Sequence, residues 1–200
     1  MSHNPAKPAS PGPVPDRLLD AALICFRRLG SKRTRIEDIA AEAGVARTAV
    51  YRYFPNRQAM VAALATRWLA EDEARLAEIA RDHETAPAER LGAFLLADAE
   101  SARRYLADPS LLEVLDEVTR RVAPVVQQHR AHVRRHLAGL LAEGIAQGAF
   151  RSDQPERLAQ TLDDLIGRFH DPQLAADLEP DIWRARAKAA IDLILQAVAA

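Results

Sequence analysis

The 200-residue sequence contains one cysteine, Cys25, and only 5% aromatic residues. A single cysteine excludes an internal disulfide, and its place in an amphipathic segment favours a small core residue over a redox sensor. No stretch approaches the roughly 20 consecutive apolar residues that cross a membrane. The Pro-rich start, residues 1–15, lacks an apolar core of signal-peptide length. We therefore expect a disordered tail on a cytoplasmic protein that has no membrane partner.

Sequence motifs of common catalytic sites are also missing. The chain has no glycine-rich phosphate loop, no Gly-x-Ser-x-Gly elbow, no Cys/His nucleophile pattern and no paired Glu-x-x-His motif. An all-helical enzyme remains a formal competitor, but no residue pattern supports it. We expect a binding protein without catalytic residues, cofactor or metal.

Helix-forming residues dominate what is present. Ala, Leu, Arg and Glu are abundant, 48% of the residues are hydrophobic, and no run of alternating β-branched residues occurs. This composition predicts an all-α fold of about nine helices with a sizeable core. Prolines, glycines and capping residues mark the helix ends beyond residue 56. Thr85 and Pro87, Asp108 and Pro109, and Asp153 with Glu156 are each expected to open a helix. The expected helices are about 57–83, 85–106, 108–118, 124–147, 153–169 and 181–199.

Residues 34–57 have the pattern of two short helices joined by a tight glycine turn. Thr34 and Glu37 fit a capping box that opens the first helix, and Gly44 can take the positive φ that ends it. The second helix is expected over about 47–54, with Val50 and Phe54 facing inward. This arrangement is the helix-turn-helix, which places its second helix in the major groove of DNA.

The residues expected to contact DNA are basic, hydroxyl-bearing or aromatic. Arginine can make paired hydrogen bonds to guanine or phosphate, and tyrosine and threonine hydroxyls can bond phosphate oxygens. The predicted contact residues are Thr34, Arg35, Arg47, Thr48, Tyr51, Arg52, Tyr53 and Arg57. A helix pair with a glycine turn also occurs in ordinary helical proteins that do not bind DNA. The distribution of charge along the chain distinguishes the two possibilities. Residues 1–60 carry a net charge of +5 and residues 61–200 a net charge of −6, which favours phosphate at one end only.

The same segment resembles the TetR/AcrR family of bacterial transcriptional regulators, and the resemblance extends upstream through residues 18–30. The matching positions are Thr34, Ile39, Ala40, Ala43, Gly44, Val45, Tyr51, Tyr53 and Phe54. The resemblance implies a three-helix DNA-binding domain at residues 16–56, a helical effector-binding and dimerisation domain at 57–200, and a palindromic operator in double-stranded DNA. Three positions depart from the family: Ala46 replaces a helix-capping serine, Ala49 a threonine and Arg57 a lysine.

The last helix is apolar over more than half its circumference, which indicates a self-association surface. The resemblance implies a homodimer formed by the last two helices of each subunit. The predicted interface residues, of which about half are expected to fill the monomer core instead, are Leu162, Leu165, Ile166, Phe169, Ile191, Ile194 and Leu195.

The resemblance also implies a small-molecule effector of unknown identity in a mostly apolar cavity, whose binding releases the operator. The predicted lining residues are Trp68, Phe94, Tyr105, Leu112, Leu115 and Phe169. This makes a repressor the expected function.

The sequence leaves open an architectural DNA-binding protein without an effector, and a metal-responsive or pH-responsive regulator using His129, His132 and His136 on one helix face. A solvated basic face is favoured there, because one ion cannot reach all three imidazoles.

Overall fold

The computed structural model describes residues 14–106, 114, 123–170, 174 and 177–200. In this part of the chain the secondary structure consists of eight α-helices and one 3-10 helix, with a single isolated bridge between Phe150 and Ala199 and no strand. The predicted all-α fold is confirmed. No helix within the described ranges is long and apolar enough to span a bilayer. Of the helix expected from Asp108 to about Val118, only residue 114 lies within these ranges.

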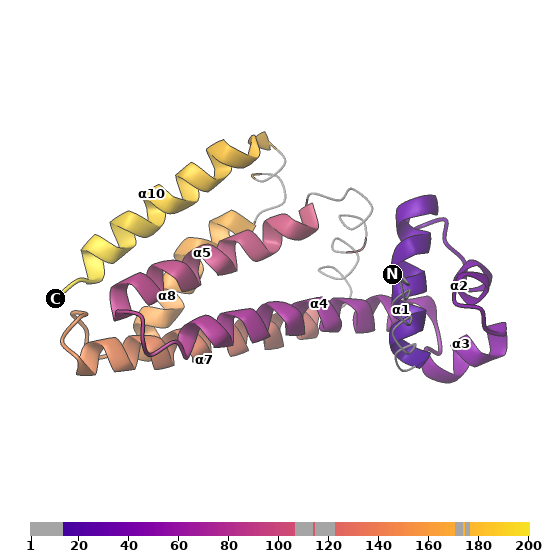
Figure 1. Cartoon of the computed structure of the whole chain (residues 1–200), viewed down its shortest axis with the longest axis horizontal. Helices are drawn as coiled ribbons and strands as arrows, with labels where there is room; N and C mark the ends of the chain where they lie inside the picture. Colours follow the sequence, from indigo (N-terminus) through magenta and orange to yellow (C-terminus); the bar gives the residue numbers. More distant parts are fainter. Residues whose placement is uncertain (1–13, 107–113, 115–122, 171–173, 175–176) are drawn as a thin grey trace, which may run out of the picture. The chain divides into compact units, whose positions relative to one another are not determined.

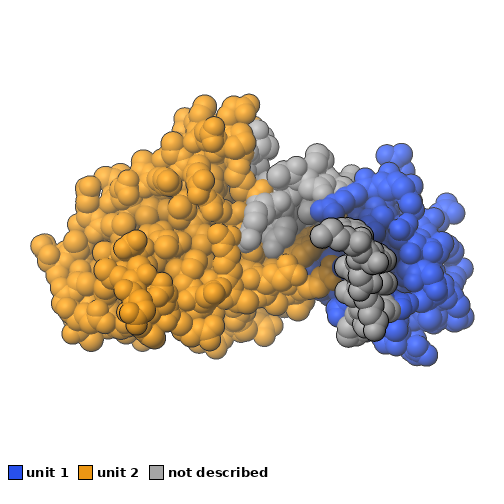
Figure 2. Space-filling model, in the orientation of Figure 1, with its two compact units in different colours: residues 1–64 blue, residues 65–200 orange. Residues whose placement is uncertain are grey.

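The chain divides into two compact units, residues 1–64 and 65–200, which Figure 2 colours separately. Unit 1 contains three helices and the beginning of a fourth, which continues into unit 2 without a break. The division therefore falls inside that fourth helix, and not at its start. The bounds are α1 Val14–Leu29, α2 Ile36–Glu42, α3 Arg47–Tyr53 and α4 Arg57–Ala80.

The core of unit 1 is built from one face of each of its helices. Phe26 of α1, Ile39 of α2 and Val50 of α3 are each at most 1% exposed. Leu64 of α4 is also buried. Cys25 lies within this core, and burial raises the pKa of its thiol, so the side chain is an unreactive core residue, as predicted.

Unit 2 is a set of helices that share one apolar core. Helix α5 packs against α7 and α10, and α7 packs against α8, as the ribbon in Figure 1 shows. Phe94, Leu137, Ile166 and Trp183 each contribute a fully buried side chain from a different helix. The elements are α5 Pro87–Leu106, α7 Ala123–Ala146, α8 Pro155–Gly167, the 3-10 helix η1 Arg168–His170 and α10 Pro180–Val198.

Two sequence signals for helix ends had different outcomes. Gly148 has a φ of +72° just beyond α7, so the helix end expected near residue 147 is confirmed. The predicted cap of α8 by Asp153 and Glu156 is wrong. Gln154 is the N-cap and makes no side-chain cap hydrogen bond. Pro155 occupies the first helical position, where its fixed φ suits the helix, so Asp153 lies one residue too early.

A close approach at Gly144 holds the end of α7 against the segment that follows it. A Cβ atom at Gly144 would lie 2.3 Å from Cε2 of the Phe150 ring, and Phe150 is itself buried. The residues on either side of Phe150 are joined to the end of α10 by two backbone hydrogen bonds. The Arg151 N–H donates to the Val198 carbonyl at 2.8 Å, and the Ala200 N–H donates to the Ala149 carbonyl at 3.1 Å.

We predict that Gly144→Ala destabilises the protein by about 1–3 kcal/mol, because the added methyl group overpacks against Phe150. The matched control is Gly139→Ala in the same helix, where an added Cβ would have no neighbour within 4 Å. That change should stabilise α7 by about 0.5–1 kcal/mol. Chemical denaturation measures both values, and equal effects of the two variants would contradict the packing argument.

Candidate DNA interface and effector unit

The turn between α2 and α3 has the geometry that the sequence predicts. Gly44 has a φ of +67°, and the Val45 N–H donates to the Ala40 carbonyl at 3.0 Å across the turn. Val50 is completely buried and Phe54 is 6% exposed, so α3 is anchored by these two side chains. Because they lie four residues apart, the opposite face of α3 remains at the surface.

The start of α2 differs from the prediction. Thr34 is 4% exposed, and its hydroxyl lies 2.9 Å from the Gly30 carbonyl and 3.2 Å from the Cys25 carbonyl, so it donates to the end of α1. The N-cap is Arg35, whose backbone N–H donates to Asp38 Oδ2 at 2.8 Å. The predicted Thr34–Glu37 capping box is therefore wrong by one residue. Thr34 ties α1 to the approach to α2.

The exposed face of α3 carries Arg47, Thr48, Tyr51 and Arg52. Arg47 Nη1 lies 2.6 Å from Glu37 Oε1, and Arg47 Nη2 donates to the Tyr51 hydroxyl at 3.2 Å. The Arg47 guanidinium also lies 5.4 Å from the centroid of the Tyr51 ring. These contacts hold a cation and a phenol together on the surface of α3, and they add Glu37, which the sequence reasoning assigned only to a helix cap.

A second cation and phenol pair follows on the same helix. Arg52 Nη2 donates to the Tyr53 hydroxyl at 3.2 Å, and the guanidinium lies 5.0 Å from the ring centroid. Tyr53 is half-buried, whereas Arg52 and the predicted contact residue Arg35 are exposed. Guanidinium groups and hydroxyls are the donors that bind phosphate oxygens and base edges.

Arg57 is engaged within unit 1. Its Nη2 donates to the Ser31 carbonyl at 2.9 Å and to the Ser31 hydroxyl at 2.5 Å, and its guanidinium lies 5.6 Å from the centroid of the Phe26 ring. The side chain therefore joins the start of α4 to the end of α1. The sequence reasoning missed Ser31 because nothing local links residues 26 positions apart.

The first turn of α3 has no side-chain cap. Ala46 is the N-cap in extended conformation and offers no hydrogen-bond acceptor, as the sequence indicates. The first amides of a helix point outward and carry partial positive charge, so this end of α3 attracts an acceptor such as a phosphate oxygen.

The residues predicted to line an effector pocket lie mostly in packed surroundings. Trp68, Phe94 and Phe169 are all less than 9% exposed. Leu112 and Leu115 lie outside the described residues, and the side chain of Tyr105 is likewise not among those described. Two hollows of about 440 and 130 Å³ occur in unit 2, and none of the six predicted residues lines either of them.

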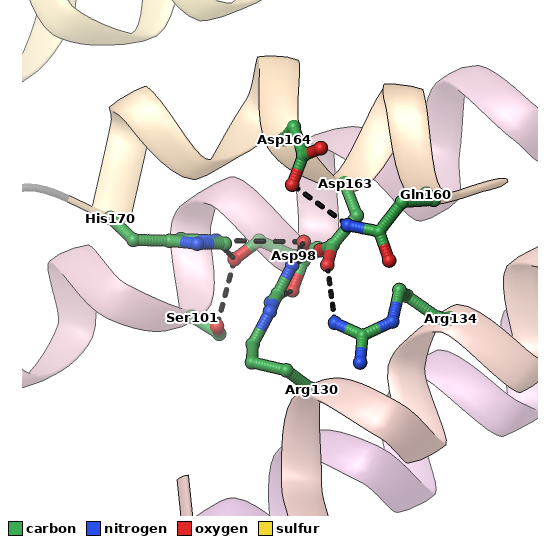
Figure 3. Close-up of polar contacts among 8 residues, drawn as sticks. All are labelled: Asp98, Ser101, Arg130, Arg134, Gln160, Asp163, Asp164 and His170. Carbon is green, nitrogen blue, oxygen red and sulfur yellow. Dashed lines mark hydrogen bonds and ion pairs between the residues drawn. The ribbon is translucent and has the colours of Figure 1, made fainter. Parts of the chain in front are cut away.

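A buried ionic cluster joins α5, α7, α8 and η1 in unit 2 (Figure 3). Arg130 Nη1 lies 2.9 Å from Asp98 Oδ1, and Arg130 also pairs with Asp163. Arg134 Nη1 donates to Asp163 Oδ2 at 3.0 Å. His170 Nε2 lies 3.2 Å from the Asp98 carbonyl, and burial lowers the pKa of this imidazole. Two carboxylates thus face two guanidiniums, and the cluster is balanced in charge.

The three histidines of α7 all lie near Glu73 of α4, but they differ in burial. Burial lowers the pKa of His129 to about 4, so this ring is neutral at pH 7. His132 Nδ1 lies 2.8 Å from Glu73 Oε2, and His136 Nε2 lies 3.7 Å from Glu73 Oε1. No group of three or more His, Cys, Asp or Glu side chains in the described ranges could hold a metal ion. Glu73 is the partner that the sequence reasoning could not identify.

The residues predicted for a dimer interface divide into two groups. Five of them are in the core cluster of unit 2, namely Leu162, Ile166, Phe169, Ile191 and Ile194. Leu165 of α8 is 54% exposed and Leu195 of α10 is half-buried. Helix α10 also exposes Ile182 at 50% and Leu193 at 67%, which lie three turns apart on one face.

The geometry of unit 1 defines a helix-turn-helix DNA-binding protein, and relatives agree with it. Residues 18–64 match the family model described as "Bacterial regulatory proteins, tetR family", and residues 87–191 match "Tetracyclin repressor-like, C-terminal domain". The chain belongs to the TetR family. This is a family of regulators and not of enzymes, so the expectation of a DNA-binding transcriptional regulator is confirmed.

Named relatives show how far the similarity extends. The chain is 27% identical over 154 residues to the HTH-type transcriptional repressor KstR2 of Mycolicibacterium smegmatis, covering 74% of this chain and 73% of that protein. SmeT, the repressor of the Stenotrophomonas maltophilia multidrug efflux pump SmeDEF, has a TM-score of 0.70 at 24% identity, with 94% and 92% of the two chains covered. A SmeT–triclosan complex has a TM-score of 0.68 at 25% identity, with the same coverage.

We predict that Ala46→Ser stabilises the protein by about 1 kcal/mol, because the hydroxyl can accept a hydrogen bond from an amide in the first turn of α3. Chemical denaturation measures the change. As a control, Ala41→Ser places the same group at an exposed position inside α2, where serine costs a few tenths of a kcal/mol. Loss of stability in both variants would show that the backbone amides at the start of α3 already have hydrogen-bond partners.

Proposed function

We propose that the protein is a homodimeric repressor that binds a palindromic operator through α3 and releases it when a small-molecule effector binds unit 2. The observation that carries this proposal is the exposed face of α3, where Arg47, Tyr51 and Arg52 lie opposite the buried Val50 and Phe54. No acidic residue lies on α3 itself. A regulator of this kind works where the DNA is, in the bacterial cytoplasm.

The two cation and phenol pairs give this face two kinds of contact. Arg47 is held by Glu37 and Tyr51 near the start of α3, where recognition helices contact base edges. Arg52 lies at the end of the helix beside Tyr53, in a position suited to backbone phosphate. We assign base reading to Arg47, Thr48 and Tyr51, and phosphate binding to Arg52 and Arg35. Thr34 and Arg57 position the helices through their contacts within unit 1.

The dimer is proposed to form through the exposed apolar side chains of α8 and α10. Leu165 remains at the surface when the core residues around it are buried, and Leu193 and Ile182 extend the apolar face along α10. Packing two copies of this face about a two-fold axis covers these side chains and presents two α3 helices. Their spacing must match one turn of DNA, about 34–36 Å.

Control by an effector is supported by the relative that is 25% identical and was solved with triclosan. In thermodynamic terms, the effector must bind more tightly to a conformation that does not fit the operator. A shift from 1% to 99% of that conformation needs a preference of about 10⁴-fold. An architectural protein without an effector would show no such shift.

We predict that Arg52→Gln weakens binding to an operator selected from random DNA and reduces the slope of log K against log salt by about 1 for each subunit. The reason is the loss of one phosphate contact at the end of α3. Fluorescence anisotropy at several salt concentrations measures both quantities. The control, Arg151→Gln, removes the same charge from an exposed position of unit 2. An unchanged slope for Arg52→Gln would refute the assigned contact.

We predict that Leu193→Glu dissociates the dimer, raising its dissociation constant at least about a hundredfold, because the carboxylate would be desolvated in the interface. Light scattering at micromolar concentration measures the mass. Ala142→Glu, at an exposed position of α7, should leave the mass unchanged. A wild-type protein that is monomeric under these conditions would overturn the proposed dimer.

A further inference from the structure

The segment that joins α1 to α2 carries a cluster of positive charge. Lys32, Arg33 and Arg35 place three cations within four residues, and all three side chains are exposed. Among the described residues, neither Lys32 nor Arg33 has an ion-pair partner or a side-chain hydrogen bond. The sequence reasoning assigned a DNA contact to Arg35 and none to the two residues before it. Packing within unit 1 gives these two charges no role.

Two buried residues hold the backbone of this segment in place. Ser31 is completely buried and accepts hydrogen bonds from Arg57 Nη2 at both its carbonyl and its hydroxyl. Thr34 is almost completely buried, and its hydroxyl donates to the Gly30 carbonyl at 2.9 Å. The exposed pair lies between these two anchors. A ligand that binds the pair therefore meets a loop that is already ordered, which limits the entropy lost on binding.

The same segment lies beside α3. Ser31 is tied to Arg57, which stands four residues beyond the end of α3. At the other end of the segment, Glu37 pairs with Arg47, the first residue of α3. Helix α3 has seven residues and is therefore only about 10 Å long. Residues 31–37 are thus linked to both ends of α3, and the exposed pair borders this helix.

This position favours the DNA backbone as the binding partner of the pair. A recognition helix in the major groove lies between two phosphate backbones, which are about 12 Å apart across the groove. Cations that border such a helix face phosphates and not base edges, and ammonium and guanidinium groups both bind phosphate oxygens. In homeodomains, which also have three helices, the loop between the first two helices contacts the backbone.

We propose that Lys32 and Arg33 form a second DNA contact, which binds phosphates beside the groove that α3 enters. This contact reads no bases, so it contributes the same factor to binding of an operator and of unrelated DNA. The proposal rests on the function proposed above for the placement of α3 in the major groove.

The first test removes both charges with the double variant Lys32→Gln, Arg33→Gln. Its affinity for a selected operator and for a random duplex should fall by the same factor, at least about tenfold at about 0.15 M salt. The slope of log K against log salt should fall by about 2 for each subunit. Fluorescence anisotropy on the full chain measures these quantities. The control variant Arg135→Gln, Arg151→Gln removes two charges from exposed positions of unit 2 and should leave the slope unchanged.

The second test locates the contact on the DNA. Ethylation of the operator removes the charge of one phosphate at a time, so it identifies the phosphates that binding requires. At least one phosphate in each half-site should be required by the wild type and not by the double glutamine variant. The exchange variant Lys32→Arg, Arg33→Lys keeps both cations and should retain the salt slope and the phosphate pattern of the wild type.

Three results would overturn the proposal. They are a salt slope of the double glutamine variant equal to that of the control, a phosphate pattern identical to that of the wild type, and a larger loss of affinity for the operator than for the random duplex. Circular dichroism verifies that each variant is folded. The slope on the random duplex tests the loop without an operator, so a wild type that selects no operator counts against the repressor function alone.

Discussion

Helices α2 and α3 have seven residues each, which is too short for an isolated helix to be stable in water. Their existence depends on burial of Ile39, Val50 and Phe54 in the core of unit 1. The proposed DNA-reading face is therefore a product of tertiary packing, because the same helix that exposes Arg47 is held in place by Val50. Fixed side chains on the inner face keep the outer donors in a defined register, which limits the entropy lost on binding.

Unit 2 depends on a different kind of interaction. Asp98 and Asp163 are almost completely buried, and each would be strongly destabilising without Arg130 and Arg134. Because the four charges come from α5, α7 and α8, sliding any of these helices would separate an ion pair in a poorly solvated interior. Ion pairs of this type have few alternative arrangements, so they favour movement of the helices as a body over gradual deformation.

Much of unit 1 could be predicted because its signals are local. Gly44, Val50 and Phe54 are fixed by spacing within one segment, and their roles were read correctly. The prediction that Thr34 caps α2 is wrong, because its hydroxyl donates instead to carbonyl groups at the end of α1. In unit 2 an apolar residue on a helix face fits a core, an interface or a pocket equally well. Only the packing shows that Ile166 belongs to the core and Leu165 to the surface.

The ion pair between Glu37 and Arg47 gives the DNA-binding face an internal competitor. In the proposed interface, a phosphate or base that binds Arg47 would compete with a carboxylate that lies 2.6 Å from the guanidinium. A site with the right bases offers paired hydrogen bonds that compensate for the displacement, whereas an arbitrary site offers charge alone. In the proposed interface the acidic residue would thus favour release from sequences that offer charge alone.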